Sequence, residues 1–223
     1  YSIPPVLAAG QNGTVVAVWC HYQVATEAYL LANVRDAGSV WGEEVELGGG
    51  TDLEATDWYP GVWPDGSAMV LYSLHGFSHD PAEDMILRWT VREPGGTWGD
   101  GGQGDLTDWL AMIRGFGIRP AADGSAVAAW GVEFTGRPAG EQTAIFASTW
   151  PPGGTFREAV QVSDWTHDAW VWQGGLALGG EARPPAVLWE AERQNPKYEA
   201  IYFSELLTGG NLVYVPLGLY QAR

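Results

Sequence analysis

The sequence has a single cysteine and no long apolar run. Cys20 is the only cysteine among 223 residues, so an intrachain disulfide is excluded. It follows Trp19 in an apolar run, which favours a small buried side chain over a reactive nucleophile. No segment approaches the roughly 18 consecutive apolar residues of a membrane-spanning helix. We therefore expect no membrane insertion.

Positive charge is also scarce. Eleven Lys and Arg residues stand against 27 Asp and Glu residues, which gives a formal net charge of −16, and Lys197 is the only lysine. A surface this negative repels the phosphates of nucleic acids and of anionic lipids. Nucleic acid and membrane surfaces are thus not expected as partners.

Glycine, proline and tryptophan are abundant. The chain has 31 Gly, 14 Pro and 13 Trp residues, 46% hydrophobic residues and only 17% charged ones. Gly and Pro are typical of turns, and Trp suits half-buried pleated surfaces. This composition predicts a globular all-β domain with many hairpins.

A turn followed by an apolar strand recurs four times. The strands end at Trp19, Tyr72, Trp130 and Trp189, with steps of 53, 58 and 59 residues. Asn-Gly or Asp-Gly precedes the first three, and both are strong hairpin signals. The first of these strands is apolar at every position, so both of its faces should be covered.

Further runs complete each repeat of about 55 residues. A second run is expected at 29–35, 85–92, 143–150 and 199–206, and a short closing strand at 44–47, 159–163 and 212–217. Repeats this small must stack to bury their apolar faces. We predict one domain over 1–223, a four-bladed β-propeller with four antiparallel strands per blade and blades near 1–55, 56–106, 107–163 and 164–223.

A tight turn and an aromatic residue follow the second run of three repeats. The best copy is Asp36-Ala-Gly38-Ser-Val-Trp41, with weaker copies at 93–98 and 152–156. This pattern resembles the Asp-box hairpin of sialidase-like bacterial β-propellers. The resemblance implies a propeller fold and a stabilising role for these hairpins, and it implies no catalytic residue.

Strand polarity places the longer, varied loops on one face, together with the connections between blades. Those connections repeat a motif, which reads Thr56-Asp57-Trp58, Thr107-Asp108-Trp109 and Ser163-Asp164-Trp165. The Ser or Thr and the Asp can cap a turn while the Trp packs between blades. Alternatively, the three Trp rings stack on sugars and the three Asp residues bind hydroxyls, or the Trp residues anchor a protein partner. We predict these six residues as the ligand-binding site.

The residues offer little for catalysis. The chain contains no phosphate loop, nucleophile elbow or zinc-helix motif, so no enzyme activity, cofactor or metal is predicted. A divalent-metal site remains an alternative, because all four histidines are expected on the loop face, at His21, His75, His79 and His167.

The chain starts at Tyr1 rather than Met, which suggests a processed product but does not assign a compartment. The resemblance to secreted bacterial propellers implies a secreted or cell-surface protein. The leading hypothesis for its function is non-catalytic glycan binding. The alternatives are a structural or protein-interaction subunit of an extracellular assembly, including a homo-oligomer, and a glycoside hydrolase that uses two carboxylates.

Overall fold

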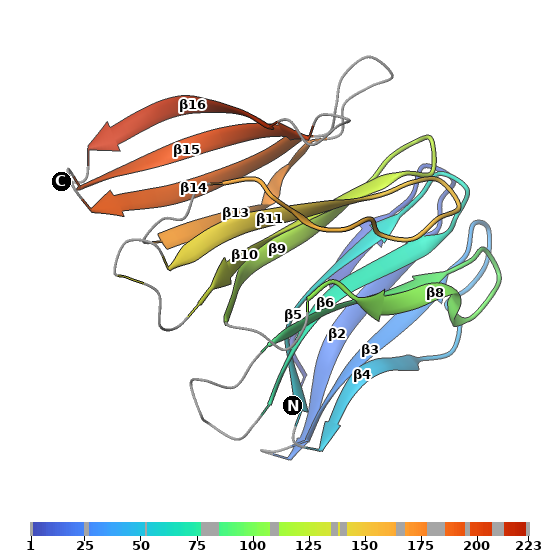
Figure 1. The fold of residues 1–223 in the computed structure, drawn as a ribbon. Helices are drawn as coiled ribbons and strands as arrows, with labels where there is room; N and C mark the ends of the chain where they lie inside the picture. Colours follow the sequence, from blue (N-terminus) through green and yellow to red (C-terminus); the bar gives the residue numbers. More distant parts are fainter. Residues whose placement is uncertain are drawn as a thin grey trace. The chain divides into compact units, whose positions relative to one another are not determined.

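The computed structural model shows an all-β chain of antiparallel sheets (Figure 1). It describes residues 2–24, 27–51, 53–76, 85–107, 112–134, 138, 142–163, 168–177, 186–194, 197–206 and 212–221, with the backbone alone beyond Ser163. No helix in this part of the chain is long and apolar enough to cross a membrane. The chain divides into two compact units, which are Tyr1–Leu110 with Pro120–Gly124, and Ala111–Arg119 with Ser125–Arg223.

Unit 1 contains eight strands that pair in sequence order. They are β1 (Val6–Ala9), β2 (Val15–Val24), β3 (Glu27–Arg35), β4 (Val45–Thr51), β5 (Leu53–Val62), β6 (Ala68–Gly76), β7 (Ile86–Arg92) and β8 (Trp98–Asp105). Strands β4 and β5 share a single register pair, Gly50 with Leu53. The sheet therefore consists of two four-stranded halves with a narrow link.

Unit 2 contains two four-stranded sheets. The first has the order β12-β11-β10-β9, and the second has the order β13-β14-β15-β16. Their strands are β9 (Met112–Pro120), β10 (Ala126–Glu133), β11 (Thr143–Trp150), β12 (Val160–Gln161), β13 (Asp168–Ala177), β14 (Ala186–Gln194), β15 (Lys197–Leu206) and β16 (Leu212–Gln221).

The register confirms the internal repeat. In each set, the aromatic residue that ends the predicted apolar strand is the register partner of a residue on the next strand. That residue is in turn the register partner of a residue on the strand after it. These rows are Trp19–Leu31–Glu46, Tyr72–Arg88–Asp105, Trp130–Phe146–Gln161 and Trp189–Tyr202–Pro216. The same pairing in all four sets shows that the sequence repeat is also a structural repeat.

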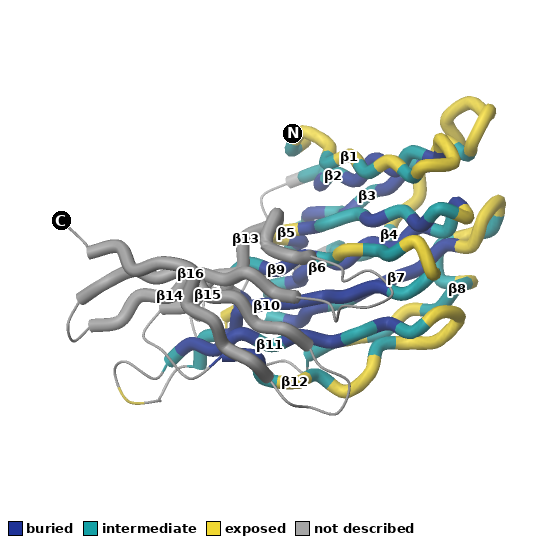
Figure 2. Tube along the Cα trace, turned by 90° about the horizontal axis from the view of Figure 1, so that it is seen from above, coloured by how far each residue is buried: buried dark blue, intermediate teal, exposed yellow. Residues whose placement is uncertain are grey.

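The two halves of the unit 1 sheet pack face to face. Alternate residues of β2, including Val16, Val18 and Cys20, share a buried cluster with Val70 and Tyr72 of β6. Figure 2 shows the strand interiors buried and the connecting turns exposed. The burial raises the pKa of the Cys20 thiol, so this side chain is a core residue, as the sequence predicts.

Unit 1 has two distinct ends. At one end, which we call the loop end, the strand ends that flank the connections β2–β3, β4–β5 and β6–β7 lie together, since Glu27 pairs with Thr51 and Leu53 pairs with Gly76. The opposite end, which we call the turn end, carries the four tight hairpins. The strand ends agree with the predicted strand polarity, whereas the connecting residues 25–26, 52 and 77–84 lie outside the described residues.

The hairpins at the turn end differ in detail from the expected two-residue turns. The N–H of Gly13 donates to the carbonyl oxygen of Gly10 at 3.0 Å, so the central residues are Gln11 and Asn12. The side chain of Asn12 accepts from the N–H of Thr14, and Gly13 takes a φ of 93°. This is a four-residue turn, Gly10 to Gly13, whose last residue is a left-handed glycine.

The Asp-box-like hairpin links the two halves of the sheet. Both carboxylate oxygens of Asp36 accept from the guanidinium of Arg92, at 2.9 and 2.7 Å. Gly38 supplies the positive φ of the turn, and Arg35 lies over the ring of Trp41. This hairpin is thus joined to the other half of the sheet by an ion pair.

Candidate functional site

The first copy of the Asp-Trp motif lies inside a strand rather than in a loop. Residues Thr56, Asp57 and Trp58 belong to β5. Trp58 is 5% exposed, and its indole N–H donates to the carbonyl oxygen of Val18 in β2 at 3.0 Å. The prediction of a loop position is therefore wrong for this copy. Because a sugar-stacking ring needs an exposed face, the packing role that was weighed beside sugar stacking accounts for Trp58.

Asp57 points away from this core. The strand bulges at Thr56, so Asp57 pairs with Ser73 while Trp58 pairs with Tyr72. The N–H of Asp57 donates to the hydroxyl of Ser73 at 3.2 Å, and that hydroxyl also bonds to the hydroxyl of Thr56 at 2.7 Å. Asp57 keeps an accessible surface, yet partial burial raises the pKa of its carboxyl. Its role as a ligand-binding residue stays a prediction.

The other two copies share a different arrangement. The hydroxyl of Thr107 accepts from the N–H of Leu87 at 2.9 Å, and the hydroxyl of Ser163 accepts from the N–H of Ile145 at 2.8 Å. The N–H of Leu106, which precedes Thr107, donates to the carbonyl oxygen of Leu87. Likewise the N–H of Val162, which precedes Ser163, donates to the carbonyl oxygen of Ile145. Each hydroxyl therefore stands in for a strand carbonyl and extends the ladder by one hydrogen bond.

By its spacing in the sequence, the counterpart of Trp58 in the next repeat is Phe116. It stands 14 residues before Trp130, as Trp58 stands 14 before Tyr72, and it is fully buried in β9. The four remaining predicted ligand residues lie outside the described residues. They are Asp108, Trp109, Asp164 and Trp165.

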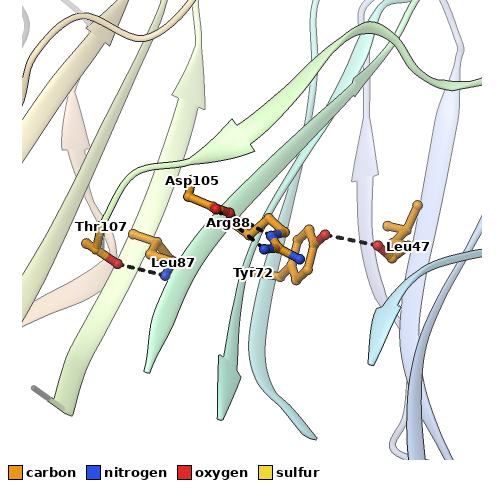
Figure 3. A network of polar contacts seen from close by, with 6 residues as sticks. All are labelled: Leu47, Tyr72, Leu87, Arg88, Asp105 and Thr107. Carbon is orange, nitrogen blue, oxygen red and sulfur yellow. Dashed lines mark hydrogen bonds and ion pairs between the residues drawn. The ribbon is translucent and has the colours of Figure 1, made fainter. Parts of the chain in front are cut away.

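A row of side chains near the loop end includes two residues, Arg88 and Asp105, that the sequence patterns do not single out. Trp58, Tyr72, Arg88 and Asp105 are successive register partners across β5, β6, β7 and β8. The guanidinium of Arg88 donates from Nε to Oδ1 of Asp105 at 2.6 Å and from Nη2 to Oδ2 at 3.4 Å (Figure 3). Both side chains are partly exposed, at 37% and 41%. The row thus runs from a buried indole to a solvent-accessible ion pair.

Tyr72 holds this row against the first half of the sheet. Its hydroxyl donates to the carbonyl oxygen of Leu47 in β4 at 2.9 Å (Figure 3). The ring lies so close to Gly48 that a Cβ there would stand 3.0 Å from ring atom Cε2. Burial raises the pKa of Tyr72 to about 12, an effect that the charge of Arg88 opposes. Tyr72 is therefore a neutral phenol at physiological pH and acts as a hydrogen-bond donor.

The ion pair is a departure from the repeat. The residues that occupy the position of Arg88 in the other three sets are Leu31, Phe146 and Tyr202. An arginine where the other repeats carry an apolar or aromatic residue was the available signal, but it becomes visible only once the register is known. Chemically, the pair offers N–H donors and carboxylate acceptors side by side.

Two of the four histidines lie in described strands of unit 1. His21 Nδ1 is 3.0 Å from the hydroxyl of Ser2, and His75 is the register partner of Glu54. Glu54 also accepts a short hydrogen bond from the hydroxyl of Tyr22. The described residues contain no group of three or more His, Cys, Asp or Glu side chains that could hold a metal ion.

Comparison with known proteins identifies a similar fold but no matching family. No protein-family model and no curated sequence matches the chain. The chain superposes on the polysaccharide lyase Uly1 with a TM-score of 0.55 and 10% identity, covering 96% of this chain and 49% of the lyase. An α-L-arabinanase of Penicillium chrysogenum, solved with arabinobiose, gives 0.56 at 13% identity over 97% of this chain and 66% of the other.

The Hadza microbial sialidase Hz136 gives a TM-score of 0.56 at 13% identity, covering 96% of this chain and 46% of the sialidase. The chain thus spans between 46% and 66% of the length of these three proteins. At such low identity the likeness concerns the fold alone. The chain has an all-β, propeller-like fold that is also found in carbohydrate-active glycosidases and lyases.

Proposed function

We propose that this protein is a non-catalytic, secreted or cell-surface β-propeller that binds glycan at its loop end. In this proposal each of the four four-stranded sets forms one blade. The four equivalent register rows support that blade count.

The observation that carries the proposal is the contrast between the two ends of unit 1. At the turn end, acidic side chains stabilise the hairpins: Asp65 caps Ser67, and Asp100 accepts from the N–H groups of Glu93 and Thr97. At the loop end, the ion pair of Arg88 and Asp105 is partly exposed, and its two side chains extend from the paired strands β7 and β8. Polar groups that a rigid sheet presents to solvent are typical of binding sites.

The fold comparison favours a glycan as the ligand. The similar structures are named for a polysaccharide lyase, an arabinanase and a sialidase. Asp57, Asp108 and Asp164 are the predicted acceptors for sugar hydroxyls, and Trp109 and Trp165 are the predicted stacking rings. Trp58 is left out of the stacking set because its ring is buried.

A role without catalysis is proposed because the predicted binding residues recur in several repeats. Catalytic groups act at one place in a molecule, whereas repeated groups suit multivalent binding, in which weak sites add to a useful avidity. Incubation with chromogenic glycosides should therefore release no product. Turnover that a single Asp57→Asn or Asp108→Asn substitution abolishes would establish a hydrolase instead.

Binding can be tested on a glycan array, followed by calorimetry with the glycan that gives the highest signal. Trp109→Ala and Trp165→Ala should each weaken binding by about tenfold or more, since stacking on an aromatic ring contributes on the order of 1–3 kcal/mol. Trp41→Ala is the matched control, because Trp41 is exposed at the turn end. Absence of binding to every glycan on the array rejects the proposal.

One observation favours the second candidate, a protein-interaction subunit. The hairpin between β3 and β4 exposes Val40 at 82% and Trp41 at 45%, and Val45 beside it is also exposed. Adjacent exposed apolar side chains are typical of protein contacts. If the protein sediments as an oligomer and Val40→Ser with Trp41→Ser yields a monomer, this second function replaces the first.

A further inference from the structure

We propose that Arg88 and Asp105 together bind two neighbouring hydroxyl groups of an uncharged sugar. This inference rests on the proposed glycan binding and specifies the class of sugar and one contact site. It concerns residues that the sequence pattern alone did not assign.

The chemistry of the pair fits a diol. Arg88 has five N–H donors in a planar fork, and two of its nitrogens face the Asp105 carboxylate at 2.6 and 3.4 Å. The guanidinium also bonds to the Tyr72 side chain. Of its five N–H groups, those not directed at Asp105 or Tyr72 remain for a ligand, and the carboxylate oxygens have lone pairs left. A sugar hydroxyl both donates and accepts, so two adjacent hydroxyls can bond to the donor side and the acceptor side of one ion pair.

The charge of the pair selects against ionic sugars. An ion pair has no net charge. An anionic sugar attracted to Arg88 is therefore repelled by Asp105, and a cationic sugar attracted to Asp105 is repelled by Arg88. The net charge of −16 adds a long-range repulsion for polyanions. A neutral glycan avoids both penalties.

The pair is also held in place before any ligand arrives. Arg88 lies between Asp105 and Tyr72 in one register row, and the hydroxyl of Tyr72 is fixed by its hydrogen bond to Leu47 (Figure 3). The ring of Tyr72 also packs against Gly48. Side chains that are already ordered lose little conformational entropy on binding. This arrangement distinguishes the pair from two mobile surface charges.

The site occurs once in the repeat. Leu31, Phe146 and Tyr202 occupy the equivalent positions in the other sets, and none of them carries a charge. The inference therefore predicts one sugar bound here per chain. That stoichiometry differs from the more than one site expected for the repeated Asp-Trp motif.

Affinity electrophoresis in soluble xylan, mannan and starch, with polygalacturonate as the anionic counterpart, tests the inference. We expect retardation by at least one neutral polymer and none by polygalacturonate. Arg88→Leu, which installs the residue of the first repeat, and the isosteric Asp105→Asn should each weaken retardation by about tenfold. Arg35→Leu is the matched control, since Arg35 stacks on Trp41 at the turn end.

The outcomes separate the two proposals. Equal retardation of wild type, Arg88→Leu and Asp105→Asn overturns this inference and leaves glycan binding standing. Preference for polygalacturonate overturns the assignment of a neutral sugar. Absence of retardation by all four polymers overturns the inference, while the wider array decides the proposed function. Thermal melts of the variants show whether a loss reflects unfolding, and Asp105→Asn keeps the shape of the side chain.

Discussion

The indole N–H of Trp58 donates to the carbonyl oxygen of Val18 at 3.0 Å and thereby connects the two halves of the unit 1 sheet. The ring is nearly inaccessible to solvent. Trp58→Ala should lower the free energy of unfolding by about 3–5 kcal/mol, because a large buried ring is lost. Trp58→Phe should cost about 1–3 kcal/mol, because the Val18 carbonyl loses its donor.

Urea unfolding followed by circular dichroism measures both changes. Trp41→Ala, at an exposed position, should stay within about 0.5 kcal/mol of wild type. A Trp58→Ala protein of normal stability that has lost glycan binding would contradict the packing role and return Trp58 to the ligand site.

The hydroxyls of Thr107 and Ser163 should matter for stability through the backbone. Thr107→Val leaves the N–H of Leu87 without its acceptor, and Ser163→Ala does the same to Ile145. Each change should cost about 1–3 kcal/mol, the usual penalty for an unsatisfied buried polar group. Hydrogen exchange at the Leu87 and Ile145 amides should accelerate in the corresponding variant only. Unchanged exchange at both amides would show that the hydroxyls are dispensable.

The ion pairs of Arg92 and of Arg88 should differ in strength. The Arg92 side chain is 9% exposed, so Asp36→Ala leaves a largely buried guanidinium without its carboxylate and should cost about 1.5–3 kcal/mol. Asp105→Ala removes the partner of the more exposed Arg88 and should cost about 0.2–1 kcal/mol. Double-mutant cycles with Arg92→Leu and Arg88→Leu measure the two coupling energies. Equal couplings would contradict this ranking.

Two aspartates should change stability with pH in opposite directions. Partial burial raises the pKa of Asp57, so its folded form holds the proton more tightly than the unfolded chain does. The resulting stabilisation is complete below the usual aspartate pKa of about 3.9 and is lost as pH rises through the folded pKa. Asp57→Asn should therefore stabilise the protein at neutral pH, with the gain disappearing in acid.

The backbone N–H groups of Glu93 and Thr97 lower the pKa of Asp100. Its stabilisation is present above about pH 3.9 and is lost as pH falls through the lowered folded pKa. Asp100→Asn should therefore destabilise at neutral pH, and its difference from wild type should shrink in acid. Urea midpoints between pH 2.5 and pH 7, chosen to span about 3.9, test both variants. Parallel profiles for the two variants would refute the assignment of opposite signs.

The repeat and the strands could be predicted because their signals are local. Glycine turns and apolar runs mark each strand, and the run predicted at 143–150 coincides with β11 (Thr143–Trp150). Closing strands were harder to place, since β4 extends to Thr51, beyond the predicted end at residue 47. Its Gly48, Gly49 and Gly50 read as a loop in the sequence, yet they pair with β3 across a bulge.

The candidate site was less predictable because it depends on register. Thr56-Asp57-Trp58 reads like the other two copies, but β4 and β5 are separated by a single residue, which places this copy inside a strand. Arg88 and Asp105 are 17 residues apart, and their pairing follows from a register shift between Thr90 and Arg92. No local pattern specifies that shift.

The contact between Gly48 and Tyr72 also constrains how this sequence can diverge. Any side chain at position 48 would press on the Tyr72 ring, so the two positions cannot change independently. Descendants of this chain that acquire alanine or serine at position 48 should carry a smaller residue at position 72. Such a replacement would also release the hydrogen bond to Leu47. Coordinated substitution at positions 48 and 72 among related sequences would therefore be evidence that the Gly48–Tyr72 contact is maintained.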